Sequence, residues 1–247
     1  NGSESIIGAN GFPIIVGLEE NSDDIKVVVC TNASCSTNSV KTIAGPGGDV
    51  LRGSVDIALP ADDRPVIAIS NGTDLDAILA RCSDSVCTSI AQVQITDADN
   101  IGDVSVDINP ATGYPVLATT NSSTYDVEII ECTNATCSTR NTHLISAAGT
   151  EGDEPAIKFN GVGDDYFVAV TKYYTGTDQR LVVYKCNNIS CGSNTRTEGS
   201  ASGAGRLPKM VIPADGLPLI TAHNFSSNYE FTTFKCDNTN CSSMTEV

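Results

Sequence analysis

Short runs of strand length, separated by turn residues, recur along this chain about every 50 residues. In the clearest copy the four runs are Ser54–Leu59, Pro65–Ser70, Asp76–Cys82 and Ile90–Ile95. The last run alternates, which is typical of a strand with one buried face, whereas the continuously apolar second run predicts burial on both faces. Pro, Gly, Asn and Asp, which favour turns, lie between the runs. No segment has a helical period over ten residues, so the pattern predicts an all-β chain.

The second run is the most regular part of the repeat, and in four of five copies a proline opens it. Proline is tolerated at the start of a strand because its missing N–H falls at the end of the hydrogen-bond ladder. The copies are Pro13–Val16, Pro65–Ala68, Pro115–Ala118, Tyr166–Ala169 and Pro218–Thr221.

Each copy also carries one Cys-x4-Cys pair, at the end of the third run. The first cysteines stand 52, 50, 54 and 50 residues apart, and the ten cysteines leave none unpaired. We expect each pair to face across a hairpin with a four-residue loop and to form a disulfide worth about 2 kcal/mol. Zinc is the alternative, but zinc sites usually use Cys-x2-Cys and need two converging pairs. The pairs are Cys30/Cys35, Cys82/Cys87, Cys132/Cys137, Cys186/Cys191 and Cys236/Cys241.

Four antiparallel strands repeated about every 50 residues resemble the blades of a tandem-repeat β-propeller. The resemblance covers all 247 residues and is architectural: the Trp-Asp ending and the sialidase-type box are missing, and the chain has no Trp. It implies one five-bladed domain with a disulfide per blade. The first run of each blade would line the central channel, and the disulfide hairpin would lie on the outer rim. The repeats span about residues 1–53, 54–103, 104–153, 154–206 and 207–247.

The chain ends where the fourth run of the fifth copy should begin, so that blade has at most a short fourth strand. We expect residues 1–5 to pair there and close the ring. In the alternative, the edge stays open and accepts a strand from another molecule.

The charge excludes several classes of partner. The chain has 30 Asp and Glu against 14 Lys and Arg, a net charge of −16. Nucleic acids require a basic surface, as do anionic membranes, and no apolar stretch is long enough to insert in a bilayer. The acidity therefore indicates solubility, with divalent-cation binding or a salty habitat as alternatives.

Disulfides indicate an oxidising compartment, and eight Asn-x-Ser/Thr sequons point the same way. We expect an extracellular or cell-surface glycoprotein, unless the chain is bacterial and its sequons are never used. The sequons cluster at expected hairpin tips: Asn1, Asn32, Asn71, Asn121, Asn134, Asn188, Asn224 and Asn240.

Candidate chemistry is sparse and lies in the expected channel. Asp56 and Asp107 occupy what we take as matching places in first runs, with Lys209 at that place in the fifth copy. Two carboxylates facing a sugar could act as a glycosidase pair. The alternative is a water-filled channel lined by salt bridges. His143 and His223 are expected to be polar residues at strand or loop ends, and no nucleophile–base motif is present.

No cofactor and no metal site is expected, with calcium at residues 97–103 as a weak alternative. This stretch offers carboxylates but lacks the ligand order of a calcium loop. Aromatic residues are 5% of the chain and do not recur at one repeat position, which argues against a repeated lectin site.

These features favour a non-enzymatic extracellular module with a structural, adhesive or assembly role, such as a subunit of a filament or surface layer. Its partners would be other proteins or further copies of itself. The alternatives are a propeller that binds glycans or another ligand with the help of a cation, and a glycoside-active enzyme that uses Asp56 and Asp107.

Overall fold

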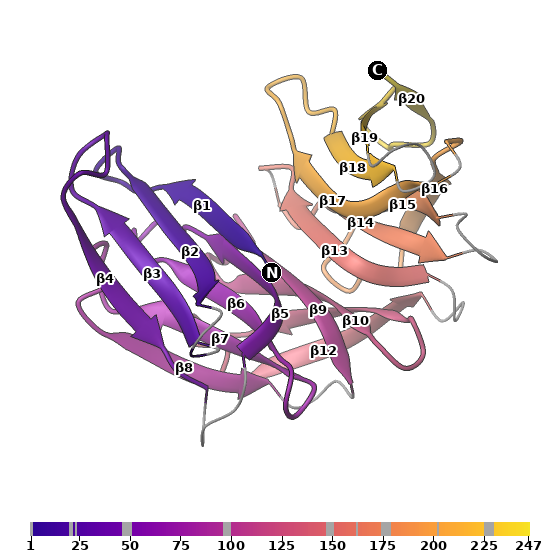
Figure 1. Ribbon diagram of the computed structural model, residues 1–247. Coiled ribbons are helices and arrows are strands. Elements are labelled where there is room, and N and C mark those ends of the chain that lie inside the picture. Colours follow the sequence, from indigo (N-terminus) through magenta and orange to yellow (C-terminus); the bar gives the residue numbers. More distant parts are fainter. Residues whose placement is uncertain are drawn as a thin grey trace.

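The computed structural model describes residues 2–19, 22, 24–45, 51–95, 100–146, 151–161, 163–173, 179–201, 203–224 and 230–247. These residues form five four-stranded antiparallel sheets, each built from one continuous segment of chain. They are arranged side by side as the blades of a five-bladed β-propeller (Figure 1). The predicted fold class is therefore confirmed. The described residues contain no helix, and hence none that could cross a membrane.

The blades are numbered 1 to 5 in chain order, and in each blade the strands follow one another from the channel to the rim. Blade 1 contains β1 (Ser3–Ile7), β2 (Pro13–Glu19), β3 (Asp24–Cys30) and β4 (Asn38–Ile43); blade 2 contains β5 (Leu51–Ala58), β6 (Val66–Asn71), β7 (Asp76–Cys82) and β8 (Ile90–Ile95); blade 3 contains β9 (Ile101–Ile108), β10 (Pro115–Asn121), β11 (Val127–Cys132) and β12 (Arg140–Ser146); blade 4 contains β13 (Glu151–Phe159), β14 (Tyr166–Tyr173), β15 (Gln179–Cys186) and β16 (Asn194–Glu198); blade 5 contains β17 (Ala204–Val211), β18 (Leu219–Asn224), β19 (Glu230–Cys236) and β20 (Met244–Glu246).

The hydrophobic core lies between the blades. The second strands of the middle blades are buried on both faces because each is covered by the blades on either side; every residue of β6 is buried. Four apolar clusters join blade 1 to blade 2, blade 2 to blade 3, blade 3 to blade 4, and blade 4 to blade 5. The outer strands keep one face in solvent, as the alternating exposure of β4 shows.

All five Cys-x4-Cys pairs form disulfides, one per blade, with Cα–Cα distances of 4.6 to 4.9 Å. The expected cross-strand geometry is wrong. Cys30 lies opposite Asn38, not Cys35, and the other first cysteines also pair with the residue eight positions later. The second cysteine instead lies inside a longer turn with a left-handed backbone, φ 52° at Cys35. The disulfide therefore locks the turn and not the ends of the two strands.

The turn is also held by the residue two positions after the first cysteine. Asn32 Oδ1 accepts a hydrogen bond from Ser36 N at 3.0 Å, and its Nδ2 donates to Ser36 Oγ and Thr37 Oγ1. Asp84 plays the same part in blade 2, where it accepts from Thr88 N at 2.9 Å. These hydrogen bonds give the sequon residue Asn32 a structural role of its own. A glycan on Asn32 would replace one of the two Nδ2 hydrogens that take part in them.

The sequons differ in accessibility. Asn71 is fully buried, which leaves no room for a glycan there, whereas Asn188 and Asn240 are exposed. Asn121, Asn134 and Asn224 are half-buried, as is Asn32, and Asn1 lies outside the described residues. Glycosylation at these sequons other than Asn71 stays a prediction.

The expected ring closure by residues 1–5 is wrong. β1 pairs with β2 as the inner strand of blade 1, through pairs such as Glu4 with Val16. The fourth strand of blade 5 is β20, which has three residues and pairs with β19. Each blade thus completes its own sheet, and among the described strands none is exchanged between the first and last blades.

Candidate functional site in the central channel

The five inner strands, β1, β5, β9, β13 and β17, surround a cavity of about 670 Å³. Its wall combines serines, among them Ser3, Ser5 and Ser54, with apolar side chains such as Ile57 and Met210. The charged side chains that line it are Glu4, Asp56, Asp103, Glu154, Lys158 and Lys209.

The strand register decides which inner-strand residues are equivalent. Asp56 lies opposite Ala68, the third residue after the proline that opens the second run, and Ser105 lies opposite Ala118 at the same place in blade 3. Asp107 lies opposite Val116, two residues further along β9. Asp56 and Asp107 are therefore not at matching positions. The matched set is Glu4, Asp56, Ser105, Ala156 and Lys209.

Asp56 joins blade 2 to blade 3. Its Oδ2 accepts hydrogen bonds from Val106 N at 2.9 Å and from Ser105 Oγ at 2.5 Å, and its Oδ1 accepts from Ile57 N at 2.8 Å. The inner strand is the free edge of its blade. The N–H groups on its unpaired side therefore need an acceptor from outside the sheet. Asp56 supplies that acceptor for the neighbouring blade.

The same arrangement recurs around the channel. Ser54 Oγ accepts from Val104 N at 2.6 Å, and Ser105 Oγ accepts from Ile157 N at 3.2 Å. Asp107 Oδ2 accepts from Phe159 N at 2.8 Å, and burial raises the pKa of Asp107. Inner-strand side chains of blades 2 and 3 therefore satisfy the free edge of the following blade.

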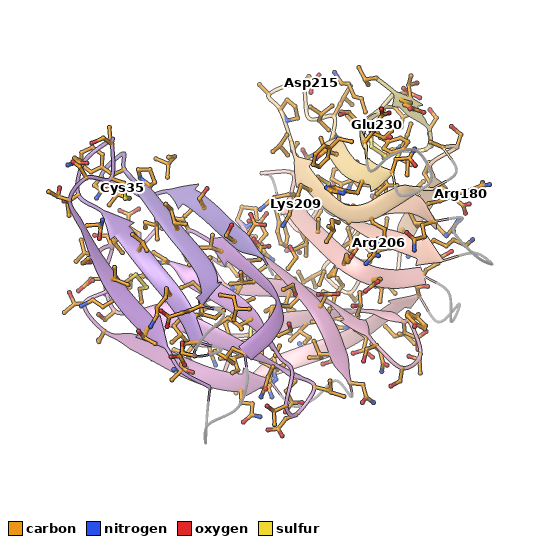
Figure 2. The ribbon with its side chains drawn as sticks, in the orientation of Figure 1. Cys35, Arg180, Arg206, Lys209, Asp215 and Glu230 are labelled. Atoms are coloured by element: carbon orange, nitrogen blue, oxygen red, sulfur yellow. A yellow bond between two sulfur atoms is a disulfide. The ribbon has the colours of Figure 1, made fainter. Side chains whose placement is uncertain are left out.

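Blade 4 meets blade 5 through a variant of this contact. Ala156 stands at the place of Asp56 and has no acceptor atom, and Glu154 takes over from a bulge with φ 52°. Glu154 Oε2 accepts from Leu207 N at 2.6 Å, and Oε1 pairs with the Arg206 guanidinium at 2.7 Å. Figure 2 shows Arg206 on the ribbon of the last blades.

Lys209 cannot accept a hydrogen bond, and it forms an ion pair with Glu4 of blade 1. Lys209 lies on the side of the last blades that faces β1 (Figure 2). This pair links the two ends of the ring at the channel, although the Lys209 side chain is largely exposed.

Two further carboxyl groups, Asp103 and Glu154, line the cavity; the sequence named only Asp103, as the last residue of the weak calcium candidate. Burial, together with the charge of Asp153 and a hydrogen bond to it, raises the pKa of Asp103 to about 7. The raised pKa means that Asp103 exchanges its proton near neutral pH and not in acid. Alignment of each first run to the following strand would have brought Asp103 and Glu154 into view, because both lie two residues before the matched position.

The histidines lie outside this cavity. His143 Nε2 lies 3.3 Å from Glu131 Oε2 near the outer edge of blade 3, and the His223 ring stacks edge-on against Phe231. Within the described ranges no three His, Cys, Asp or Glu side chains are grouped to hold a metal. Asp97 and Asp99 of the weak calcium candidate lie outside those ranges.

No known protein family and no curated protein matches the sequence. Solved structures do resemble the fold. A GH43 endo-arabinanase from Bacillus licheniformis is 13% identical with a TM-score of 0.54, over 92% of this chain and 91% of that one. TolB from Acinetobacter baumannii is 9% identical with a TM-score of 0.58, over 95% of this chain and 50% of that one. The Dos1 propeller is 11% identical with a TM-score of 0.55, over 95% and 55%. At these identities the likeness is one of fold alone: the chain is a five-bladed β-propeller.

Proposed function

We propose that this protein is a non-enzymatic extracellular module with a structural, adhesive or assembly role. The observation that carries this proposal is the use of the channel carboxylates. Asp56, Asp107 and Glu154 each accept a backbone hydrogen bond from the next blade. A catalytic carboxylate must instead be free to reach a substrate. The acidic residues that the sequence offered as a catalytic pair therefore have a structural use.

The extracellular location rests on the disulfides. All ten cysteines are oxidised. In every pair except the first, whose second member is Cys35, the second cysteine is buried in the contact with the preceding blade. Such bridges persist in oxidising compartments. Glycans at the exposed Asn188 and Asn240 would fit the same location.

The test is turnover. Purified oxidised protein is incubated with a panel of plant, fungal and bacterial polysaccharides that includes arabinan, and released reducing ends are measured. We expect no release above a heat-inactivated control. Release that disappears in the Asp103→Asn variant would overturn the proposal and would assign the activity to the channel.

A sugar-binding or glycoside-active channel is the second candidate, and one observation favours it. The cavity of about 670 Å³ is lined by Asp103, whose pKa is raised to about 7 by burial and by Asp153, and by ionisable side chains from the four other blades. A carboxyl group that keeps its proton near neutral pH could serve as a general acid. The GH43 endo-arabinanase with the same fold makes arabinan the first substrate to try. A glycan array with and without calcium separates binding from turnover, and a blank array under both conditions counts against this candidate.

A further inference from the structure

Blade 5 has a sheet face that is covered in every other blade. On the third strand of each blade, alternate side chains point toward the next blade. At one matched position this side chain is apolar in all five copies. It is 0 to 3% exposed in blades 1 to 4, where the next blade covers it, and 71% exposed in blade 5. The register pairs that define the position join these third-strand residues to the fifth residue after the start of the second run. The matched residues are Ile25, Ala77, Val127, Leu181 and Phe231.

Blade 1 has the complementary uncovered face. The second residue after the start of the second run points toward the preceding blade, and it is 0% exposed in blades 2 to 5 but 36% exposed in blade 1. The second cysteine of each disulfide shows the same difference in exposure: Cys35 of blade 1 is half-buried, and its four counterparts are buried. Cys35 is labelled on blade 1 in Figure 2. The matched residues are Ile15, Ile67, Leu117, Val168 and Ile220.

The two uncovered faces belong to one seam. Apolar clusters fill the four junctions between consecutive blades, and within the described part of the chain no such cluster joins blade 5 to blade 1. Figure 1 shows the ribbons of β1 and β17 set apart where other inner strands run close together. The Lys209–Glu4 ion pair spans the seam at its inner end. Both faces are therefore open in a single molecule.

We propose that the free face of blade 5 binds the free face of blade 1 in a second copy of this chain, head to tail. The inference rests on the proposed assembly role and names its partner. The occupant follows from the repeat: at all four internal junctions a face of the blade 5 type is covered by a face of the blade 1 type. A second copy presents that same face, so the contact continues an interface that the molecule already builds four times.

The composition of the faces indicates a reversible contact. Lys26 on β3 points away from the blade 1–2 core, and its ammonium group forms an ion pair with Glu19 at 3.0 Å. The matched residue of blade 2 is the buried Ile78. Charged residues beside exposed apolar ones are typical of contacts that form and dissociate. Because the two surfaces differ, the contact is heterologous, and the rotation between copies decides whether it gives a closed ring or an extending chain.

The experiment uses one-sided variants in sedimentation velocity over a wide concentration range. Wild-type protein is expected to associate as concentration rises. Phe231→Asp blocks one face and Ile15→Asp the other, so each variant alone is expected to stay monomeric. An equimolar mixture is expected to form dimers and nothing larger, since one intact face of each kind remains. Leu144→Asp is the matched control, because Leu144 is 55% exposed on β12, away from the seam, and it should associate like wild type.

Thermal melting of each variant checks that the fold is intact. A wild-type protein that stays monomeric at all concentrations overturns the inference, and so does association that both seam variants retain. The outcomes are independent of the turnover assay. Release of sugar by an associating protein would refute the proposed function and leave the seam contact standing. A catalytically silent monomer would do the reverse.

Discussion

The Asp56 carboxylate of blade 2 and the Val106 amide of blade 3 form a hydrogen bond of 2.9 Å across the junction between their blades. It satisfies an N–H group at the free edge of β9, and Ser105 donates to the same oxygen. A side chain that could be mistaken for a catalytic acid in a channel thus helps to hold the propeller together.

Asp56→Ala should destabilise the protein by about 1–3 kcal/mol, because it leaves the Val106 N–H and Ser105 hydroxyl without their acceptor in a half-buried place. Chemical denaturation measures the change in the free energy of unfolding. Asp56→Asn, which keeps one carbonyl oxygen, should cost less. Asp63→Asn is the control, since Asp63 has a left-handed backbone (φ 59°) in a turn, and asparagine tolerates that conformation. Equal stability of Asp56→Ala and wild type would show that the bond contributes nothing.

Asp103 should make the protein less stable as the pH rises from about 4 to about 7. Burial and Asp153 raise the pKa of Asp103 to about 7 in the folded state, above its unfolded value of about 4. The folded state therefore holds an extra proton in this window and loses that advantage as the proton leaves. Asp103→Asn should match wild type near pH 4 and become the more stable protein above pH 7. Melting temperatures of the two proteins over this range give the comparison, and a constant difference would exclude the raised pKa.

The repeat and its alternating pattern predicted the architecture well because both come from local rules. Period-2 burial and turn residues mark strands, and one cysteine pair per copy marks blades. The register of the channel was beyond such counting. Asp56 lies nine residues before Pro65, whereas its counterpart Ser105 lies ten before Pro115. A turn that varies by one residue moves the equivalence, and only the ladder of hydrogen bonds fixes it.

The seam between blade 5 and blade 1 could not be predicted from the sequence, for a different reason. Phe231 and Leu181 are both apolar residues at the same repeat position, and nothing in either run distinguishes them. Their burial depends on whether another blade follows, which is a property of the whole ring. The prediction of the disulfide geometry was wrong for a related reason. The left-handed backbone at Cys35 and its counterparts is set by the turn as a whole and cannot be read from the Cys-x4-Cys spacing.

The blade 1 disulfide should be the first to be reduced. Cys35 is half-buried, whereas Cys87, Cys137, Cys191 and Cys241 are at most 1% exposed. A thiolate can attack a disulfide only where it can reach a sulfur. Brief treatment with limiting reductant, followed by alkylation and peptide mass spectrometry, should label Cys30 and Cys35 ahead of the others. Simultaneous labelling of all five pairs would mean that reduction requires global unfolding.

Glu151 should be the most sensitive acidic residue outside the channel. Its side chain is buried and is paired with Lys172 Nζ at 3.3 Å, with Arg196 Nε at 3.0 Å and with the Tyr184 hydroxyl. Burial alone would raise the pKa of Glu151, but the hydrogen bonds from Arg196 and Tyr184 hold it below its usual range. Removing one partner of a buried ion pair leaves the other charges uncompensated.

Glu151→Gln should therefore destabilise the protein by about 3 kcal/mol at neutral pH. The lowered pKa fixes the sign of the pH effect: the stabilisation by Glu151 is present above its unfolded pKa and is lost as the pH falls through the folded pKa. The gap in unfolding free energy between wild type and Glu151→Gln should accordingly narrow in acid. Glu230→Gln is a suitable control, because Glu230 is an exposed residue on β19. A gap that stays constant from neutral to acidic pH would show that packing, and not the charge of Glu151, accounts for the loss.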